Sequence, residues 1–248
     1  MLKTRDQIEK MRVANKIVGN LLKHLAGIAA AGMTTQELDD IAVDWCARHG
    51  ARPAFLGYSG YPRTLCTSIN EEVVHGIPSS GRVLKEGDLL SIDFGVEIDG
   101  FYGDSAITVA IGEVDSEARR LMDVTRESLM KGIEQARVGN RLFDISHAIQ
   151  MHAEGAGYSV VRDFVGHGIG QAMHEPPQIP NFGQPGKGPR LKAGMVMALE
   201  PMVCIGGWEV DVLADGWTAL TRDRKLSAHF EHTIAITETG PDILSLAD

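Results

Sequence analysis

The chain has 248 residues, of which 44% are hydrophobic and 23% charged, with a formal net charge of −9 at pH 7. These values predict a soluble globular protein with a sizeable core, and the negative charge argues against a nucleic-acid binder held by a basic patch. No stretch reaches the roughly 18 apolar residues of a membrane span, and the start of the chain lacks the apolar region of a signal peptide. Three widely spaced cysteines, Cys46, Cys66 and Cys204, indicate a reducing compartment without disulfides, so we expect a cytoplasmic protein.

Two helices are predicted in the first fifty residues. Residues 5 to 30 carry apolar side chains at helical spacing. A second helix is expected from Thr35 to about His49, where Gly50 closes it. A loop rich in Gly, Tyr and Pro follows, and short strands are predicted near 65–69 and 73–74.

Residues 84 to 111 read as two apolar strands joined by a tight turn at Asp99-Gly100, a dipeptide typical of β-hairpins. Counting outward from that turn places Asp93 and Asp104 on one face, opposite or diagonal to one another. Two like charges in an apolar sheet repel and are poorly solvated, so a cation between them would explain the arrangement. The alternative is that one Asp caps the turn and the other is exposed at an edge. The hairpin alone does not decide between them.

The second half of the chain repeats this plan. Helices are predicted from Ser116 to about Gln135 and from Leu142 to Ala153, and further strands follow. When the sequence is compared with itself at a constant offset of 107 positions, several residues align with an identical or chemically similar residue. The pairs are Gly32 with Gly139, Gly50 with Gly157, Gly81 with Gly188, Leu84 with Leu191, Gly87 with Gly194, Gly100 with Gly207, and Asp93 with Glu200. We therefore expect an α+β fold of two pseudo-symmetric halves, with a central antiparallel sheet, outer helices and one domain over residues 1–248.

Three further side chains are candidate metal ligands. Glu200 ends an apolar strand, Glu231 lies in a second strand-like run, and His167 sits in the glycine-bounded loop GHGIG. With the two Asp of the hairpin they make five ligands rich in oxygen, which suit two divalent cations among Mn, Fe, Co and Zn. A metal pair about 3.5–4 Å apart can share a water and lower its pKa towards ~7, which is the equipment of a metallohydrolase. His229 and His232, which flank Glu231, are interpreted as supporting or structural residues.

Five stretches of the chain together match the pattern of one enzyme family. They are GYSGYPRTLCTSINEEVVHGIP, IDFGVEIDGFYGDSA, GHGIGQAMHEPP, MALEPM and DGWTALTRDRKLSAHFEHTIAIT. On these stretches the chain resembles the type I methionine aminopeptidases of the short bacterial kind, and the resemblance covers essentially the whole sequence. The family fold is the pita-bread fold of two pseudo-symmetric halves, which agrees with the internal repeat. The short gap between Glu200 and Glu231 leaves no room for the helical insertion of type II enzymes.

The resemblance assigns a role to each candidate ligand. It implies that Asp93 chelates one metal ion and that Asp104 and Glu231 bridge both. It implies that His167 and Glu200 bind the second ion, and that Glu200 also acts on the nucleophilic water. Two further histidines, His75 and His174, would line the site and contact the peptide and the tetrahedral intermediate.

The resemblance also implies a methionine pocket with an aromatic, soft wall, which suits a flexible thioether. Two wall positions depart from the common family pattern: Phe55 stands where a cysteine is common, and Met173 where an aromatic residue is common. One wall gains bulk and the other loses it. We therefore expect that methionine stays preferred when a small residue such as Gly, Ala or Ser follows it. The other wall residues implied are Tyr58, Tyr61, Cys66, His75 and Trp217.

Two alternative functions are open at this point. A proline-specific peptidase of the same fold would cleave Xaa-Pro bonds, but such enzymes usually carry a separate N-terminal domain. A binding module that has lost its metals would show broken ligand positions, whereas all five are intact here. The resemblance further implies peptides and nascent chains with N-terminal Met as substrates, the ribosome as a candidate partner, a monomeric enzyme, and no binding to nucleic acid or membranes.

Overall fold

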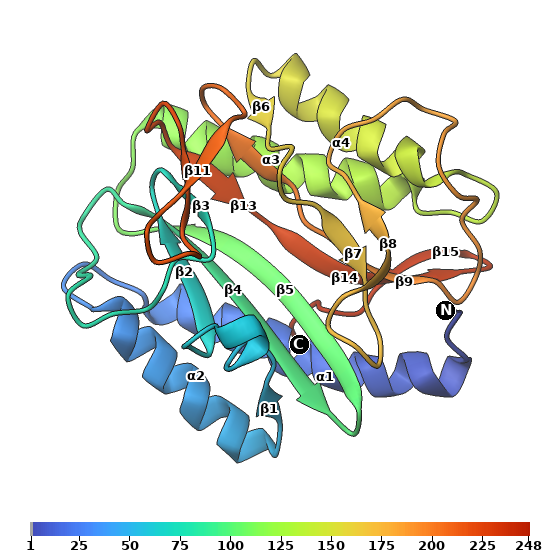
Figure 1. The fold of residues 1–248 in the computed structure, drawn as a ribbon, viewed down its shortest axis with the longest axis horizontal. Coiled ribbons are helices and arrows are strands. Elements are labelled where there is room, and N and C mark those ends of the chain that lie inside the picture. The colour runs from blue at the N-terminus through green and yellow to red at the C-terminus, as the bar shows by residue number, and fades with distance from the viewer. Residues whose placement is uncertain (1) are drawn as a thin grey trace.

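The computed structural model describes residues 2–248 as a curled antiparallel sheet with long helices packed on its outer face (Figure 1). The α-helices in this part of the chain are α1 (Arg5–Ile28), α2 (Thr35–His49), α3 (Ser116–Gln135) and α4 (Leu142–Gly155), and a short 3-10 helix, η1, spans Tyr58–Gly60. None of these described helices is both long enough and apolar enough to cross a membrane. The main sheet runs in the order β1 (Arg52–Pro53), β4 (Leu89–Ile98), β5 (Phe101–Ala110), β14 (Glu231–Thr237), β9 (Val196–Leu199), β7 (Gly166–Gly168), β8 (Glu175–Ile179), with β2 (Leu65–Ile69) on β4 and β15 (Gly240–Ile243) on β14. The predicted α+β fold with outer helices is confirmed.

The first two helices begin where their caps dictate. Thr4 caps α1 in a capping box with Gln7, and Thr34 caps α2 in the same way with Glu37. Helix α2 runs from Thr35 to His49, and Gly50 follows it in the left-handed conformation, as predicted. Helix α1 ends at Ile28, two residues before the predicted end.

The long hairpin forms as predicted from β4 (Leu89–Ile98) and β5 (Phe101–Ala110). Asp99 and Gly100 both have positive φ, of 52° and 77°, as the predicted tight turn requires. Asp93 pairs with Ala106, and Asp104 pairs with Gly95. The two Asp are therefore diagonal neighbours on one face of the sheet.

The second half contains the same hairpin in broken form. Its first strand is split into β9 (Val196–Leu199) and β10 (Met202–Cys204), and its second into β13 (Ser227–His229) and β14 (Glu231–Thr237). Pro201 has no backbone N–H for a ladder, so the strand is interrupted at Glu200. The backbone of Glu200 therefore lies outside both strands.

Hydrogen bonds and strand registers confirm the two-fold repeat. Gly32 donates to the carbonyl of Leu84, and Gly139 donates to that of Leu191. Strand β1 (Arg52–Pro53) pairs with β4 as β6 (Ser159–Val160) pairs with β10, 107 positions further on. The halves join where β5 and β14 run antiparallel, with Ala106 opposite Glu231. The other strands are β2 (Leu65–Ile69), β3 (Glu72–Val74), β7 (Gly166–Gly168), β8 (Glu175–Ile179), β11 (Val210–Val212), β12 (Ala219–Thr221) and β15 (Gly240–Ile243).

Each half buries its helices against its own strands. In the first half Leu21 and Leu25 of α1 pack in one apolar cluster with Phe94 of β4. In the second half Leu129 of α3 shares a cluster with Met197 of β9. Burying such side chains contributes about 1.5–3 kcal/mol each, so the helices hold the sheet in its curl. The concave inner face is left for the polar residues.

Candidate metal centre

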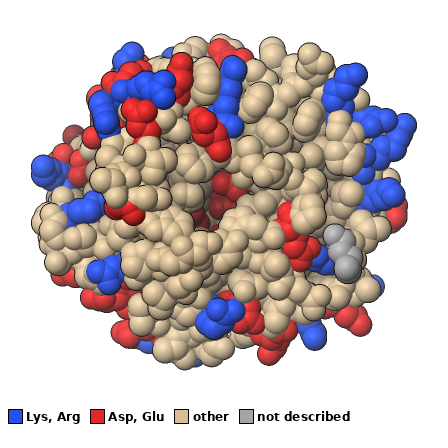
Figure 2. Space-filling view, in the orientation of Figure 1, with Lys and Arg blue, Asp and Glu red and all other residues tan. Residues whose placement is uncertain are grey.

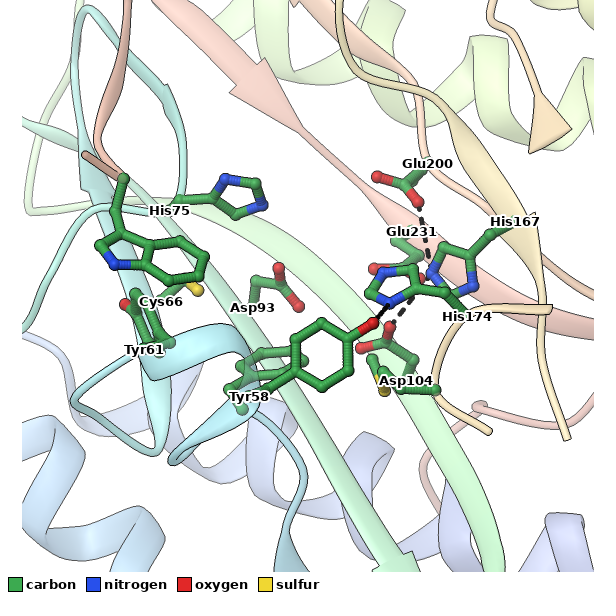
Figure 3. A pocket seen from close by; sticks show the side chains of 13 residues that line it. Tyr58, Tyr61, Cys66, His75, Asp93, Asp104, His167, His174, Glu200 and Glu231 are labelled. Carbon is green, nitrogen blue, oxygen red and sulfur yellow. Dashed lines mark hydrogen bonds and ion pairs between the residues drawn. The ribbon is translucent and has the colours of Figure 1, made fainter. Parts of the chain in front are cut away.

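The inner face of the sheet holds one cavity of about 160 Å³, which has room for a side chain and several waters. Carboxylates lie at the bottom of the hollow that opens on the face shown in Figure 2. The cavity brings together side chains from both halves of the chain (Figure 3). Its lining residues are Phe55, Tyr58, Tyr61, Cys66, His75, Asp93, Asp104, His167, Met173, His174, Glu200, Trp217 and Glu231. Every candidate site residue from the sequence therefore lies at this one place.

Four carboxylates converge from neighbouring strands. Asp93 and Asp104 come from the β4–β5 hairpin, Glu231 from the start of β14, and Glu200 from the break between β9 and β10. Asp93 Oδ1, Asp104 Oδ1 and Glu231 Oε1 are buried and have no hydrogen-bond partner within the described chain. Buried polar atoms without partners are costly and uncommon, so these oxygens point to a bound group that the chain is built to receive.

The pKa shifts of the carboxylates also indicate a bound group with positive charge. Burial raises the pKa of Asp93 well above its usual value, and the nearby charge of Asp104 raises it further. Burial likewise raises the pKa of Glu200 and of Glu231, and in both cases the other carboxylates of the group add to the effect. Four acids can share such a site at neutral pH only if protons or cations compensate their charge.

His167 is arranged as a nitrogen ligand. Its Nδ1–H donates to the carbonyl of Gly168 at 2.9 Å, which leaves the Nε2 lone pair facing the acids. Nε2 lies 3.6 Å from Asp104 Oδ2 and 3.6 Å from Glu200 Oε1. Burial lowers the pKa of His167, so the imidazole is neutral, as metal binding requires.

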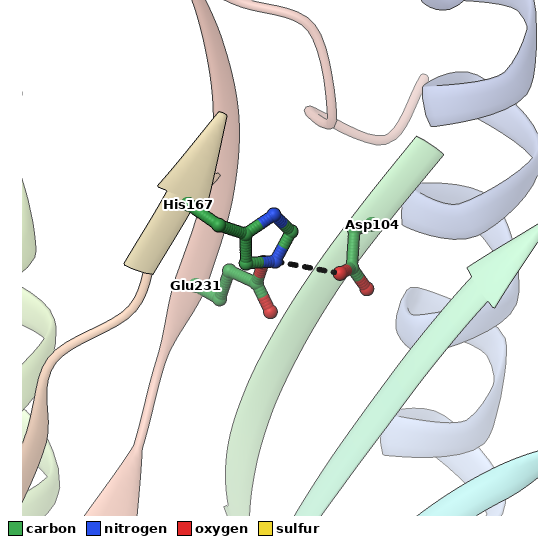
Figure 4. A group of neighbouring side chains, drawn as sticks. All are labelled: Asp104, His167 and Glu231. Atoms are coloured by element: carbon green, nitrogen blue, oxygen red, sulfur yellow. Dashed lines mark ion pairs between the residues drawn. The ribbon is translucent and has the colours of Figure 1, made fainter. Parts of the chain in front are cut away.

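Asp104, His167 and Glu231 each offer one ligand atom within 4.8 Å of the other two (Figure 4). Carboxylate oxygens with one imidazole nitrogen suit Mn, Fe, Co or Zn. The donor set, its burial and its unpaired oxygens therefore fit divalent metal ions.

The raised pKa values lead to a prediction for the metal-free protein. Its folded state holds protons on carboxyl groups that the unfolded chain releases above about pH 4, so its stability should fall as pH rises towards the raised values. Added Mn or Co should replace these protons. We expect calorimetry to show a larger metal-induced gain in Tm at pH 8 than at pH 5.5. A gain that is equal at the two pH values would contradict this.

The wall of the cavity away from the acids is aromatic, and hydrogen bonds to backbone carbonyls fix one of its rings. The Tyr61 hydroxyl lies 2.9 Å from the carbonyl oxygen of Leu65 and 3.1 Å from that of Gly76, and its single proton is shared between these two acceptors. The Trp217 ring meets Tyr61 edge-on, with ring centroids 5.0 Å apart. These contacts fix the wall before any ligand arrives.

The two wall positions that depart from the family pattern lie side by side. A Cβ atom placed on Gly95 of β4 would come within 2.8 Å of the Phe55 ring and 3.3 Å of Met173 Cε. Both side chains therefore cover the same glycine. Their neighbouring positions allow the bulk of Phe55 to be offset by the flexible Met173.

Two more histidines face the cavity in neutral form. His174 Nδ1 lies 2.7 Å from the Tyr58 hydroxyl, and its ring centroid is 4.2 Å from that of His167. Burial lowers the pKa of His174 to about 4 and that of His75 to about 4. His75 has a φ of 62°, an uncommon backbone state for a non-glycine residue that is typical of functional sites.

Two supporting asparagines are not predicted by the sequence analysis. Asn15 on α1 accepts a hydrogen bond from the Asp104 backbone, and Asn181 donates to the Glu200 carbonyl. His229, which the sequence analysis interprets as a supporting or structural residue, is buried, and its Nε2 has no hydrogen-bond partner within the described residues and lies 4.0 Å from Glu200 Oε2. It occupies in the second half the register position that Asp104 occupies in the first, because it pairs with Met202 as Asp104 pairs with Gly95. Asn15 could have been noticed as a polar residue on the apolar face of α1, but the sequence does not show that its partner is Asp104.

Known proteins are similar to this chain in sequence and in fold. The profile of metallopeptidase family M24 matches residues 9–238. A methionine aminopeptidase of Clostridium acetobutylicum is 52% identical over the whole of this chain and 99% of its own length. The crystal structure of a methionine aminopeptidase from Thermotoga maritima is 47% identical, covers 99% of both chains and superposes with a TM-score of 0.98.

A prolidase from Pyrococcus furiosus shares the fold alone, at 22% identity and a TM-score of 0.79. This chain spans 66% of that prolidase, so the prolidase has further structure that this chain does not match. The site geometry, the profile over most of the chain and the full-length identity to curated relatives agree. The chain therefore belongs to metallopeptidase family M24, within the group of methionine aminopeptidases.

Proposed function

We propose that the chain removes N-terminal methionine from peptides and nascent proteins whose second residue is small, by metal-assisted hydrolysis of the first peptide bond. The observation that carries this proposal is one cavity in which an acidic, metal-binding end meets an aromatic, thioether-compatible wall. The ligands proposed for two divalent ions are Asp93, Asp104, His167, Glu200 and Glu231. When bound, such ions neutralise the carboxylates and lower the pKa of water.

The five ligands are proposed to divide between two metal positions. Asp93 would chelate the first ion, and His167 with Glu200 would bind the second. Asp104 and Glu231 would bridge the two positions, which is supported by their place at the centre of the sheet, where β5 meets β14.

Glu200 and His174 are proposed to act on the reacting peptide. A carboxylate in a buried site can take the proton from the attacking water and return it to the leaving amine. If the Tyr58 hydroxyl donates to His174 Nδ1, the Nε2–H of His174 is free to donate to the developing oxyanion. His75, which also lines the cavity, would contact the peptide.

The wall of the pocket supplies a prediction about specificity. Phe55→Ala should enlarge the space over Gly95, because the Phe55 ring fills it. We expect relative cleavage of peptides with N-terminal Leu or Phe to rise, while Met peptides lose no more than about 200-fold in kcat/KM. The kcat/KM ratio of Leu-Ala-Ser to Met-Ala-Ser measures the effect. An unchanged ratio would remove Phe55 from the pocket.

The function itself is tested by a panel of peptides assayed with Mn, Fe, Co or Zn added to metal-free protein. Met-Ala-Ser should be cleaved, with norleucine tolerated in place of Met, and dipeptides of the Xaa-Pro kind should not. Preferred cleavage of Xaa-Pro would instead favour a prolidase-like activity. Turnover of N-terminal Leu, Ala or Lys as fast as Met would refute the proposal.

We further propose that residues 1–248 act as one catalytic domain, as a cytoplasmic monomer that meets nascent chains near the ribosome. Support for a reducing compartment comes from Cys46, Cys66 and Cys204, which are buried and free in the described chain. Light scattering after size exclusion and co-sedimentation with ribosomes test the monomer and the partner.

A further inference from the structure

A buried ion pair joins the segment before α1 to the loop that carries Met173 and His174. The Lys3 ammonium pairs with Glu175 Oε2, and the two side chains are only 5% and 16% exposed. The backbone N–H of Lys3 donates to the carbonyl of Gly194 at 2.7 Å, which fixes the segment on the second half of the sheet. Lys3 thus reaches the loop from a part of the chain 172 positions away.

Glu175 holds the loop from inside. Its second oxygen, Oε1, accepts from the backbone N–H groups of Gln171 at 2.9 Å and Ala172 at 3.3 Å. The carboxylate therefore accepts from the loop on one oxygen and pairs with Lys3 on the other. Burial raises the pKa of Glu175, but the hydrogen bond and charge of Lys3 outweigh it and lower the pKa overall. The carboxylate is charged, and it needs a cation beside it.

The fit around Lys3 is tight. A Cβ atom on Gly170 would lie 2.2 Å from Lys3 Cε and 2.6 Å from Glu175 Oε1. The carbonyl of Gly170 also accepts from Tyr102 N at 2.9 Å, which ties the loop to the β4–β5 hairpin. The ammonium thus lies against the loop backbone, between two fixed parts of the sheet.

The loop carries two side chains of the cavity. Met173 is 3% exposed and forms part of the proposed methionine wall. His174 directly precedes Glu175 and reaches Tyr58 across the cavity (Figure 3). A displacement of the loop by about 1 Å would move both.

We propose that Lys3 is a positioning residue for the reaction: its ion pair with Glu175 holds the loop of residues 169–174, and so Met173 and His174, in place at the cavity. This inference rests on the proposed function, since it assigns Lys3 a part in the same reaction. It explains why a lysine and a glutamate are paired beside the cavity, where removal of Lys3 would leave the Glu175 carboxylate without its cation.

The test compares Lys3→Met, Glu175→Gln and the double variant, each with saturating metal. In Lys3→Met the buried carboxylate loses its cation, and we expect kcat on Met-Ala-Ser to fall about 10²-fold with wild-type metal stoichiometry. Glu175→Gln removes the charge-assisted contact between Lys3 and the loop and should lower kcat by a similar factor. The double variant leaves no unpaired charge, and its amide oxygen can still accept from the loop, so kcat should recover about tenfold or more over Lys3→Met.

Hydrogen–deuterium exchange provides a readout that does not need activity. Backbone amides of residues 169–174 should exchange faster in Lys3→Met than in the wild type. The matched control is Arg12→Met, which breaks the 2.7 Å pair between Arg12 and Asp242, away from the loop. It should alter neither kcat nor exchange in residues 169–174.

Three results would overturn the inference: wild-type kcat in folded Lys3→Met, unchanged exchange in residues 169–174, or a double variant as impaired as Lys3→Met. If Lys3→Met does not fold, Glu175→Gln and the double variant carry the same comparison. If the wild type itself does not cleave Met-Ala-Ser, the proposed function fails, and exchange still decides whether Lys3 holds the loop.

Discussion

Asp104→Asn is expected to abolish cleavage of Met-Ala-Ser and to release at least one metal ion per chain. Asp104 is buried beside His167 and Glu231, and Asn cannot supply the negative charge that two cations require there. Loss of the carboxylate proposed to bridge the two ions should remove several kcal/mol of transition-state stabilisation, so activity should fall by more than about 10³-fold. Glu231→Gln should behave alike. Kinetics and metal analysis of the same purified sample measure both effects.

Asp99→Asn is the matched control for this change. Asp99 lies on the same hairpin, is exposed at the turn and has a φ of 52°, which Asn tolerates well. It should retain activity and metal. Two-metal stoichiometry with full activity in Asp104→Asn would remove Asp104 from the metal centre.

Glu200→Gln is expected to lower kcat by about 10²–10⁴-fold while KM changes little. Its amide can neither take a proton from the attacking water nor return one to the leaving amine. Metal analysis and kcat measured at several added metal concentrations would show whether the loss persists when metal is restored. A raised KM with kcat intact would contradict a role in proton transfer.

His174→Ala should act on the same step more weakly. Loss of one donor to a developing oxyanion costs about 10²–10³-fold in kcat. Among the described residues the His174 side chain hydrogen-bonds the Tyr58 hydroxyl and no carboxylate, so metal content should stay at the wild-type level. Loss of metal in His174→Ala would show that the ring supports the metal centre instead.

The features that the sequence predicts best are those set by local patterns. The Asp99-Gly100 turn fixes the hairpin, and the period of two in its strands then places Asp93 and Asp104 on one face. The spacing of glycines at an offset of 107 follows from turns with positive φ that recur in both halves, as at Gly32 and Gly139. Helix bounds are predicted to within two residues because caps and apolar periodicity coincide.

Long-range partners could not be predicted in this way. The pattern of acids indicates a cation site and places Glu200 at the end of a strand, but it does not show that His229 lies beside Glu200. The pairing of Lys3 with Glu175 depends on how the sheet curls, and no local rule links two residues 172 positions apart. Register between distant strands is decided by tertiary packing, so contacts of this kind appear only in the fold.

The most direct test of the central claim is a calorimetric titration of metal-free wild-type protein with Mn or Co, run beside an assay of Met-Ala-Ser cleavage at each point. We predict two bound ions per chain, activity that appears only as metal is added, and no binding above one ion per chain in Asp104→Asn. Full cleavage of Met-Ala-Ser by protein shown to be metal-free, or two-ion binding that is unaffected in Asp104→Asn, would contradict the account.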